Sequence, residues 1–263
     1  MGQIKIKNGL DIPISGFPDQ NVIESKRVTK TAVIADDYVN MKPTMAVEEG
    51  DTVKKGQVLF TDKKNQKIKF TSPASGIVTG VNRGERRALI SVEISISGTE
   101  EVVFPSFSED QVKELAVEKI KEVLLESGEW VSLRERPFSK VANPDNEPAA
   151  IFVTAMDTNP LAPSIEKVLT GKEKEFNAGL TVLSKLTKGS IYLCKSPAEN
   201  ISYPVISNLK VEDFSGPHPA GNAGTHIHFL EPVGKNKSVW YINAQDTAAI
   251  GSLFLTGKIY TER

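Results

Sequence analysis

Two patterns of apolar and polar positions divide the chain. Over the first part, short segments alternate apolar with polar or small residues and are broken by glycines. This alternation predicts β-strands that bury one face. After Phe104, helical spacings alternate with short, continuous apolar runs, which predicts an α/β fold. We therefore expect two domains, at residues 1–103 and 104–263, with the core of the first spanning residues 30–100.

The second part predicts a parallel sheet with helices. Ser108 is the expected N-cap of a helix over 108–127 that Gly128 ends. Residues 149–156 are a continuous run of β-formers, typical of a strand buried on both faces. The further prediction is a helix over 164–186, strands over 190–195, 209–214 and 237–244, and a helix over 245–256. This order indicates a Rossmann-like domain, which binds ligands at the carboxyl ends of its strands.

Composition narrows the function classes. The 263 residues include 32 basic and 33 acidic side chains, so no nucleic-acid partner is expected. No apolar run approaches the roughly 20 residues that span a bilayer, and the start lacks the apolar core of a signal peptide. The only cysteine, Cys194, lies in a predicted strand and has no partner for a disulfide. These features predict a soluble chain in a reducing, cytoplasmic compartment.

All three histidines lie in residues 216–229, GPHPAGNAGTHIHF. This segment predicts a turn, a loop and a short strand. On a strand, His226 and His228 would share a face and, with His218, approach a common ion. Alternatively, the glycines allow close backbone packing and the imidazoles bond to nearby carbonyls. We favour the second interpretation and expect no metal site, because no Cys or acidic residue stands at zinc spacing.

Two other loops are candidate sites. Asp157 and Asn159 follow the predicted buried strand, and we group them with the three histidines as a structural or interaction loop. The other loop suits a flat aromatic or anionic group, unless its arginines pair with surface acids and its aromatics are core. Its candidate residues are Trp130, Arg134, Arg136, Phe138 and Lys140. No nucleotide fingerprint or nucleophile elbow occurs, so no catalytic residue is predicted.

About forty residues resemble a known module. The segments GDTVKKGQVL and SPASGIV are similar to the biotinyl and lipoyl carrier domains, whose fold is a barrel-sandwich hybrid. In those carriers a lysine at a hairpin tip holds the prosthetic group, and Lys63 is the candidate here. Lys63 lies among Lys64, Lys67 and Lys69, however, and the hairpin spacing departs from that of the carriers. We therefore expect a structural module.

A wider resemblance covers essentially the whole chain. The segments IKIKNGLDIPISG, KKGQVLFTDKKN, RPFSKV, AIFVTAMDTNPLA and GPHPAGNAGTHIHF resemble the A-subunit family of bacterial Na+-translocating NADH:quinone reductases. The resemblance implies a peripheral subunit on the cytoplasmic face of the inner membrane. Its six-subunit complex oxidises NADH with flavins and iron-sulfur centres, reduces ubiquinone and exports sodium. The implied neighbours are the other subunits, above all the B subunit in the membrane.

The resemblance also implies site roles. It implies no redox cofactor on this chain, and the region that binds flavin in related subunits corresponds to residues 128–140, where arginines and aromatics replace the required glycines. The five candidates from Trp130 to Lys140 would hold ubiquinone; the alternative is a docking surface in a scaffold subunit. The family continues past Arg263 into a β-grasp domain and a helical tail. We therefore expect Arg263 to be an artificial boundary, the fragment to be inactive, and sodium to pass elsewhere.

Overall fold

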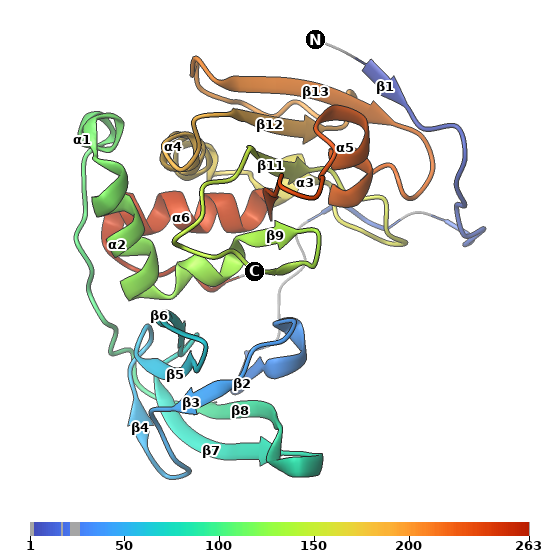
Figure 1. Cartoon of the computed structure of the whole chain (residues 1–263). Helices are drawn as coiled ribbons and strands as arrows, with labels where there is room; N and C mark the ends of the chain where they lie inside the picture. The colour runs from blue at the N-terminus through green and yellow to red at the C-terminus, as the bar shows by residue number, and fades with distance from the viewer. Residues whose placement is uncertain (1–2, 17, 22–26, 263) are drawn as a thin grey trace.

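The structure is a computed structural model that describes residues 3–16, 18–21 and 27–262; Arg263 lies outside them. A β region and an α/β region pack on one another, with the C-terminal end of the chain between them (Figure 1). Over the described ranges, no helix has both the length and the apolar character needed to cross a membrane. The arrangement agrees with the predicted order of a β domain followed by an α/β domain.

The β region consists of short antiparallel strands in two sheets, ordered β2-β8-β7-β4 and β3-β5-β6. The strands are β2 (Lys30–Ile34), β3 (Pro43–Met45), β4 (Thr52–Val53), β5 (Val58–Asp62), β6 (Asn65–Thr71), β7 (Gly76–Arg83) and β8 (Leu89–Ile96). Their alternating pattern buries one face: in β7, Gly76, Val78 and Gly80 are buried, whereas Ile77 is exposed. The buried side chains of both sheets join one core.

The α/β region is built on a mixed sheet with the order β1-β13-β12-β11-β14-β9-β10. Its strands are β1 (Gln3–Lys5), β9 (Arg134–Arg136), β10 (Lys140–Val141), β11 (Ala150–Ala155), β12 (Ser190–Lys195), β13 (Leu209–Ser215) and β14 (Val239–Asn243). Strands β1, β13, β12, β11 and β14 run parallel, and β9 and β10 extend the edge antiparallel. The order β13-β12-β11-β14 is the 3-2-1-4 order of a Rossmann half.

Helices cover both faces of this sheet (Figure 1). They are α1 (Glu109–Glu114), α2 (Val117–Ser127), α3 (Ile165–Val168), α4 (Glu173–Ser184), α5 (Ala223–Leu230) and α6 (Ala244–Thr256), with the 3-10 turns η1 (Ala35–Asp37), η2 (Glu85–Arg87) and η3 (Glu129–Ser132). In β11, Ile151 and Val153 face the core shared with α4 and α6, whereas Phe152 packs in the core beneath α5. The prediction that this strand is buried on both faces is confirmed.

Helices α4 and α6 cross in close contact because each has a glycine at the crossing. A Cβ at Gly251 would lie 1.7 Å from the carbonyl oxygen of Glu175, and one at Gly179 would lie 1.9 Å from that of Thr247. Any side chain at these positions would push the helices apart. The crossing holds the helical layer against the sheet.

Two predicted helices are each broken. Ser108 caps α1 through a capping box with Gln111, as expected, but Leu115 and Ala116 adopt extended backbone before α2 begins. The helix predicted over 164–186 is interrupted between α3 and α4, where Gly171 has a φ of 74°. Gly128 ends α2, as predicted, and does so in the left-handed conformation.

The strand predicted at His226 to His228 is wrong, because this segment lies in helix α5. Asn222 precedes the helix with extended backbone, and the buried side chains are His226 and Ile227. The alternation of histidine and isoleucine suggested a strand, whereas burial against the sheet stabilises a helix.

The first strand does not belong to the β region. Strand β1 pairs in parallel with β13, with Gln3 opposite Asp213. The segment after β1 continues over the α/β region, where Leu10 N–H donates to the carbonyl of His218. The division at residue 103 stays a prediction, but this pairing attaches the start of the chain to the second domain.

Candidate functional site

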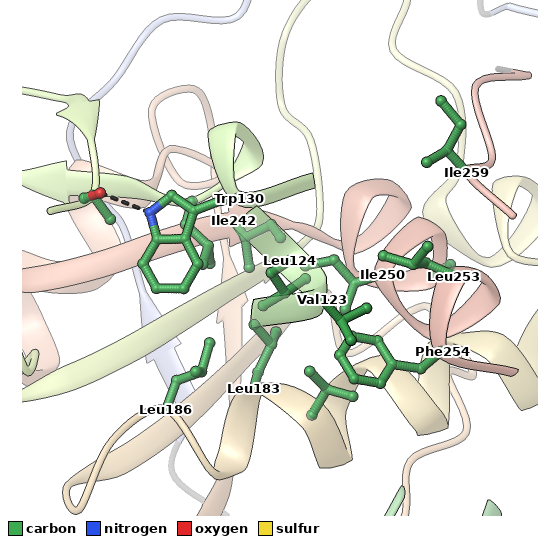
Figure 2. Packing of buried hydrophobic residues seen from close by; sticks show 14 of the residues in the cluster. Val123, Leu124, Trp130, Leu183, Leu186, Ile242, Ile250, Leu253, Phe254 and Ile259 are labelled. Carbon is green, nitrogen blue, oxygen red and sulfur yellow. Dashed lines mark hydrogen bonds between the residues drawn. The ribbon is translucent and has the colours of Figure 1, made fainter. Parts of the chain in front are cut away.

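Trp130 is a core residue. Its side chain is fully buried, its indole N–H donates to the carbonyl of Ala142 at 2.8 Å, and its ring meets Trp240 edge to face at 5.5 Å. Figure 2 shows this hydrogen bond and Trp130 among the buried hydrophobic residues of the core. The alternative that the loop's tryptophan packs in the core therefore holds, and Trp130 presents no free face for a ligand.

Arg134 and Arg136 occupy alternate positions of β9 and reach two different cavities. The guanidinium carbon of Arg134 lies 4.8 Å from the centre of the Tyr38 ring, and that of Arg136 lies 5.4 Å from the centre of the Tyr241 ring. Nη1 of Arg134 and Nε of Arg136 are buried with no hydrogen-bond partner among the described residues. Buried donors of this kind are normally satisfied, so each arginine has unused binding capacity.

Phe138 and Lys140 lie on the hairpin that β9 and β10 form. The Phe138 ring is 68% exposed, and the ammonium of Lys140 lies 5.1 Å from its centre. The structure thus separates the five candidates of the loop: one in the core, two on a surface hairpin, and one in each of two cavities.

The first cavity, which we call the interdomain cavity, lies where the two regions meet and holds about 200 Å³. It is lined by Val33, Tyr38, Phe70, Thr71, Pro73, Gly128, Glu129, Val131, Ser132, Arg134, Asp246, Ile259 and Thr261. Burial raises the pKa of Tyr38, and the neighbouring Arg134 opposes that rise. The Tyr38 hydroxyl therefore stays protonated at neutral pH and can donate a hydrogen bond.

Contacts between the two regions fix the walls of this cavity. The Thr71 hydroxyl donates to the carbonyl of Ser127 at 3.0 Å, and Lys69 forms an ion pair with Glu126. At the far side, the Thr261 hydroxyl donates to the carbonyl of Pro73 at 2.8 Å. The cavity is therefore framed by both regions.

The second site, which we call the α5 groove, consists of two lobes that share Gly224 and His228. The smaller lobe holds about 310 Å³ and is also lined by Arg136, Pro137, Ile227, Pro232 and Val233. The larger lobe holds about 560 Å³ and is also lined by Lys5, Ile6, Lys7, Asn8, Pro219, Thr225 and Phe229. The groove thus joins the β9 hairpin to the end of β1.

The three histidines do not converge. His226 is buried against Phe214, its Nε2 lies 2.8 Å from the carbonyl oxygen of Ala220, and burial lowers its pKa to about 4. His228 is exposed, and Nδ1 of His218 lies 3.1 Å from the Thr158 hydroxyl. Across the residues that the structure describes, no three His, Cys, Asp or Glu side chains come together as a metal site would require.

Asp157 and Asn159 shape the loop after β11. The Asp157 carboxylate accepts from both the backbone and side-chain nitrogens of Asn159, at 2.8 and 2.7 Å. The Thr158 hydroxyl accepts a hydrogen bond from the backbone N–H of Gly221 at 3.0 Å. A Cβ added to Gly221 would lie 2.7 Å from the backbone nitrogen of Thr158. These contacts favour the predicted structural role, in which glycine allows two backbones to approach.

The chain's own N-terminal segment packs across the loop at this end of the sheet. A Cβ at Gly9 would lie 2.1 Å from the carbonyl oxygen of His218, whose N–H donates to the Asp11 carboxylate at 3.3 Å. Ligands of Rossmann-like sheets bind near the carboxyl ends of the strands. Here polypeptide occupies part of that space.

The candidate carrier lysine and the cysteine lie in different surroundings. Lys63 lies in the turn between β5 and β6, where its backbone N–H donates to the carbonyl of Lys42, and Lys64 bonds through its ammonium to the carbonyl of Asn40. Cys194 is buried, and burial raises the pKa of its thiol. The thiol stays protonated, as expected of a small core residue.

Sequence reasoning missed Tyr38, Lys5, Lys7 and Gly224 as lining residues. Tyr38 comes from the β region, and its proximity to Arg134 depends on how the two regions pack. Lys5 and Lys7 reach α5 only because β1 pairs with β13. A signal was present in the alternating IKIK start, which predicts a strand with lysines on one face.

Comparisons with known proteins agree with this fold. Residues 4–97 match the profile of the NqrA N-terminal barrel-sandwich hybrid domain, and residues 115–259 match that of the NqrA second alpha/beta domain. The predicted fold class is confirmed.

Curated relatives match over nearly the whole chain. Over 99% of its length, the chain is 54% identical to the A subunit of the Na(+)-translocating NADH-quinone reductase of Histophilus somni strain 2336. It is 51% identical to the proteins of the same name from Glaesserella parasuis and Haemophilus influenzae strain PittGG. The chain spans 58% of the length of each of these relatives.

Proposed function

Since the chain belongs to the NqrA family, we propose that it serves as part of the peripheral A subunit of a Na+-translocating NADH:quinone reductase, on the cytoplasmic face of a bacterial inner membrane. Its relatives are named as A subunits of the Na(+)-translocating NADH-quinone reductase, and these names support the assignment to that complex. Within it, the chain acts at the quinone-reduction end and in assembly, next to the B subunit in the membrane. It carries no redox cofactor of its own, while the complex uses NADH, flavins, iron-sulfur centres and ubiquinone.

The observation that carries the role at the quinone end is the unpaired Nη1 of Arg134 in the interdomain cavity. A quinone headgroup needs flat apolar contact and a donor to its carbonyl oxygen. Phe70 and Ile259 supply apolar walls, and the protonated Tyr38 hydroxyl adds a second donor beside Arg134. Of the five residues that the sequence proposed for quinone, Arg134 is the one that lines this cavity.

The test uses the complete complex with the full-length subunit, carrying Arg134→Gln or Tyr38→Phe. NADH oxidation by an artificial acceptor is measured beside reduction of a short-chain ubiquinone. Loss of one hydrogen bond is worth about 1.4 kcal/mol, so we expect kcat/KM for ubiquinone to fall about tenfold. Artificial-acceptor activity should not change.

Arg83→Gln is the matched control, because Arg83 is an exposed arginine of β7 that bonds only to the carbonyl of Arg87 among the described hydrogen bonds. An unchanged ubiquinone kcat/KM in both cavity variants would refute the quinone role. Loss of the mutated subunit from the purified complex would instead support assembly as its function.

The second candidate is a scaffold subunit without a ligand site. It is favoured by the exposed apolar side chains Leu10, Ile12 and Ile14 in the segment that follows β1. Contiguous apolar surface of this kind often marks a protein interface. Replacing all three with serine should detach the subunit from the complex if the segment docks it, and native gel electrophoresis measures that loss. Full retention would refute docking through this segment.

A further inference from the structure

The α5 groove has the size and shape of a small-molecule site. Its lobes hold about 310 and 560 Å³ and share Gly224 and His228 in their walls. Small-molecule sites typically occupy about 300 to 1,000 Å³ and combine apolar walls with few polar groups. The groove therefore differs from the smaller interdomain cavity in both size and lining.

The charge of the groove has one sign. Arg136 lines the smaller lobe and Lys5 and Lys7 the larger, whereas no Asp or Glu lines either. Within the part of the chain that the structure describes, none of these three cations forms an ion pair. Low-dielectric walls strengthen the attraction of such a cluster for an anion.

Arg136 is held in position but lacks an acceptor. Its guanidinium lies over the Tyr241 ring, which fixes its plane, and its Nε is buried without a hydrogen-bond partner. A guanidinium presents donors in a planar fork that matches the oxygens of a carboxylate. An anion in the smaller lobe would pair with the part of the Arg136 guanidinium that lines it, whose Nη2 lies toward Gly224.

Apolar side chains and a glycine complete the groove. Pro137, Ile227 and Val233 line the smaller lobe, and Phe229 lines the larger with its ring half exposed. At Gly224, an added Cβ would have one neighbour within 4 Å, Nη2 of Arg136 at 3.6 Å. The glycine therefore keeps open the space between α5 and Arg136, where the lobes meet.

We infer that the α5 groove binds a small organic anion with a flat apolar body, of the aromatic carboxylate class. The anionic group pairs with Arg136, and the apolar body lies along Ile227 and Phe229 with Lys5 and Lys7 beyond it. This inference does not rest on the proposed function, because it concerns a different cavity and needs neither quinone nor the complex.

The test titrates 2-naphthoate into the isolated chain by calorimetry, with the neutral isostere 2-naphthamide as the comparison ligand. We expect saturable binding of 2-naphthoate. Its affinity should fall at least about tenfold in Arg136→Gln, because this variant loses one charge-assisted hydrogen bond to the carboxylate. The second variant, Gly224→Leu, should weaken binding to a similar degree by filling the junction. Leucine favours a helix more than glycine does, so this variant should keep the fold.

Arg83→Gln removes the same charge from β7 in the other region and should leave 2-naphthoate binding unchanged. Tryptophan fluorescence checks that every variant is folded, since both tryptophans are buried in the α/β region. Equal binding of 2-naphthoate to wild type and Arg136→Gln would overturn the assignment. So would equal affinities for 2-naphthoate and 2-naphthamide, or the absence of saturable binding.

Discussion

The β region and the α/β region differ in how their strands pair. In the β region, the pairings are antiparallel, and the hairpins β5–β6 and β7–β8 join strands that follow one another in the chain. In the α/β region, β11 lies between β12 and β14, and β1 pairs with a strand from the other end of the chain. The first region therefore contains antiparallel hairpins, whereas the parallel strands of the second need crossover connections.

The two regions also differ in their relation to the candidate sites. The core of the β region continues into that of the α/β region, and its hairpin lysines Lys67 and Lys69 pair with Asp145 and Glu126 across the boundary. Both sites form where distant segments meet, the interdomain cavity at Tyr38 and Arg134 and the α5 groove where β1 and the β9 hairpin approach α5. Substitutions within each region and at the boundary between them therefore test this comparison.

The largest expected effect is that of Gly251→Leu at the crossing of α4 and α6. The new side chain would collide with the backbone of Glu175, and overpacking against backbone should destabilise the α/β region by more than about 4 kcal/mol. Denaturant unfolding followed by tryptophan fluorescence measures it. Gly234→Ala is the control, because its Cβ would meet only the Lys237 side chain at 3.9 Å. A loss below about 1 kcal/mol would mean that the helices separate easily.

Next is Leu59→Ala in the core of the β region. Leu59 is fully buried, and its truncation should cost about 2 to 5 kcal/mol through lost burial and the cavity left behind. Because the tryptophans lie in the other region, fluorescence should report a smaller shift than far-UV circular dichroism. Coincident transitions by both probes would show instead that the two regions unfold as one unit.

Acid should destabilise the α/β region through His226. Burial lowers its pKa from the usual 6.5 to about 4, so the unfolded chain binds the proton first as pH falls. Stability should decrease between pH 6.5 and about 4 by up to about 3 kcal/mol and then level off for this group. His226→Gln, measured over the same range, should flatten this slope even though it lowers stability at pH 7. An unaltered slope would exclude His226 as the titrating group.

The smallest effect concerns the ion pair between the regions. Lys69 of β6 and Glu126 of α2 are both partly exposed to solvent, and such pairs contribute less than about 1 kcal/mol. Glu126→Gln should therefore change the unfolding midpoint only slightly, and high salt should remove the difference from wild type. A larger loss would indicate that this pair, rather than apolar packing, couples the two regions.

Local signals in the sequence predicted the fold well. The N-cap at Ser108, the helix end at Gly128 and the continuous apolar run of β11 each depend on residues close in sequence, and each is present. Helix α5 was mistaken for a strand because a three-residue alternation carries little information against burial on a sheet. The break between α1 and α2 was likewise invisible to periodicity.

The sites were predicted only in part. The sequence did identify both arginines that line the cavities, Arg134 and Arg136. Clustered arginines between a helix and a strand are visible in a sequence. That Trp130 is core, and that Tyr38 and Lys5 complete the two cavities, follows from contacts between segments far apart in the chain. No local pattern encodes such contacts.

The pairing of β1 with β13 makes the β region, by connectivity, an insertion inside the α/β fold. During synthesis the first strand emerges about two hundred residues before its partner, and the β region can fold in the interval. The edge of the α/β sheet is therefore completed only after β13 is made, by a strand synthesised about two hundred residues earlier. A fusion tag joined directly to the beginning of the chain would thus disturb the domain that lies farther along it, and a spacer before β1 would relieve that disturbance.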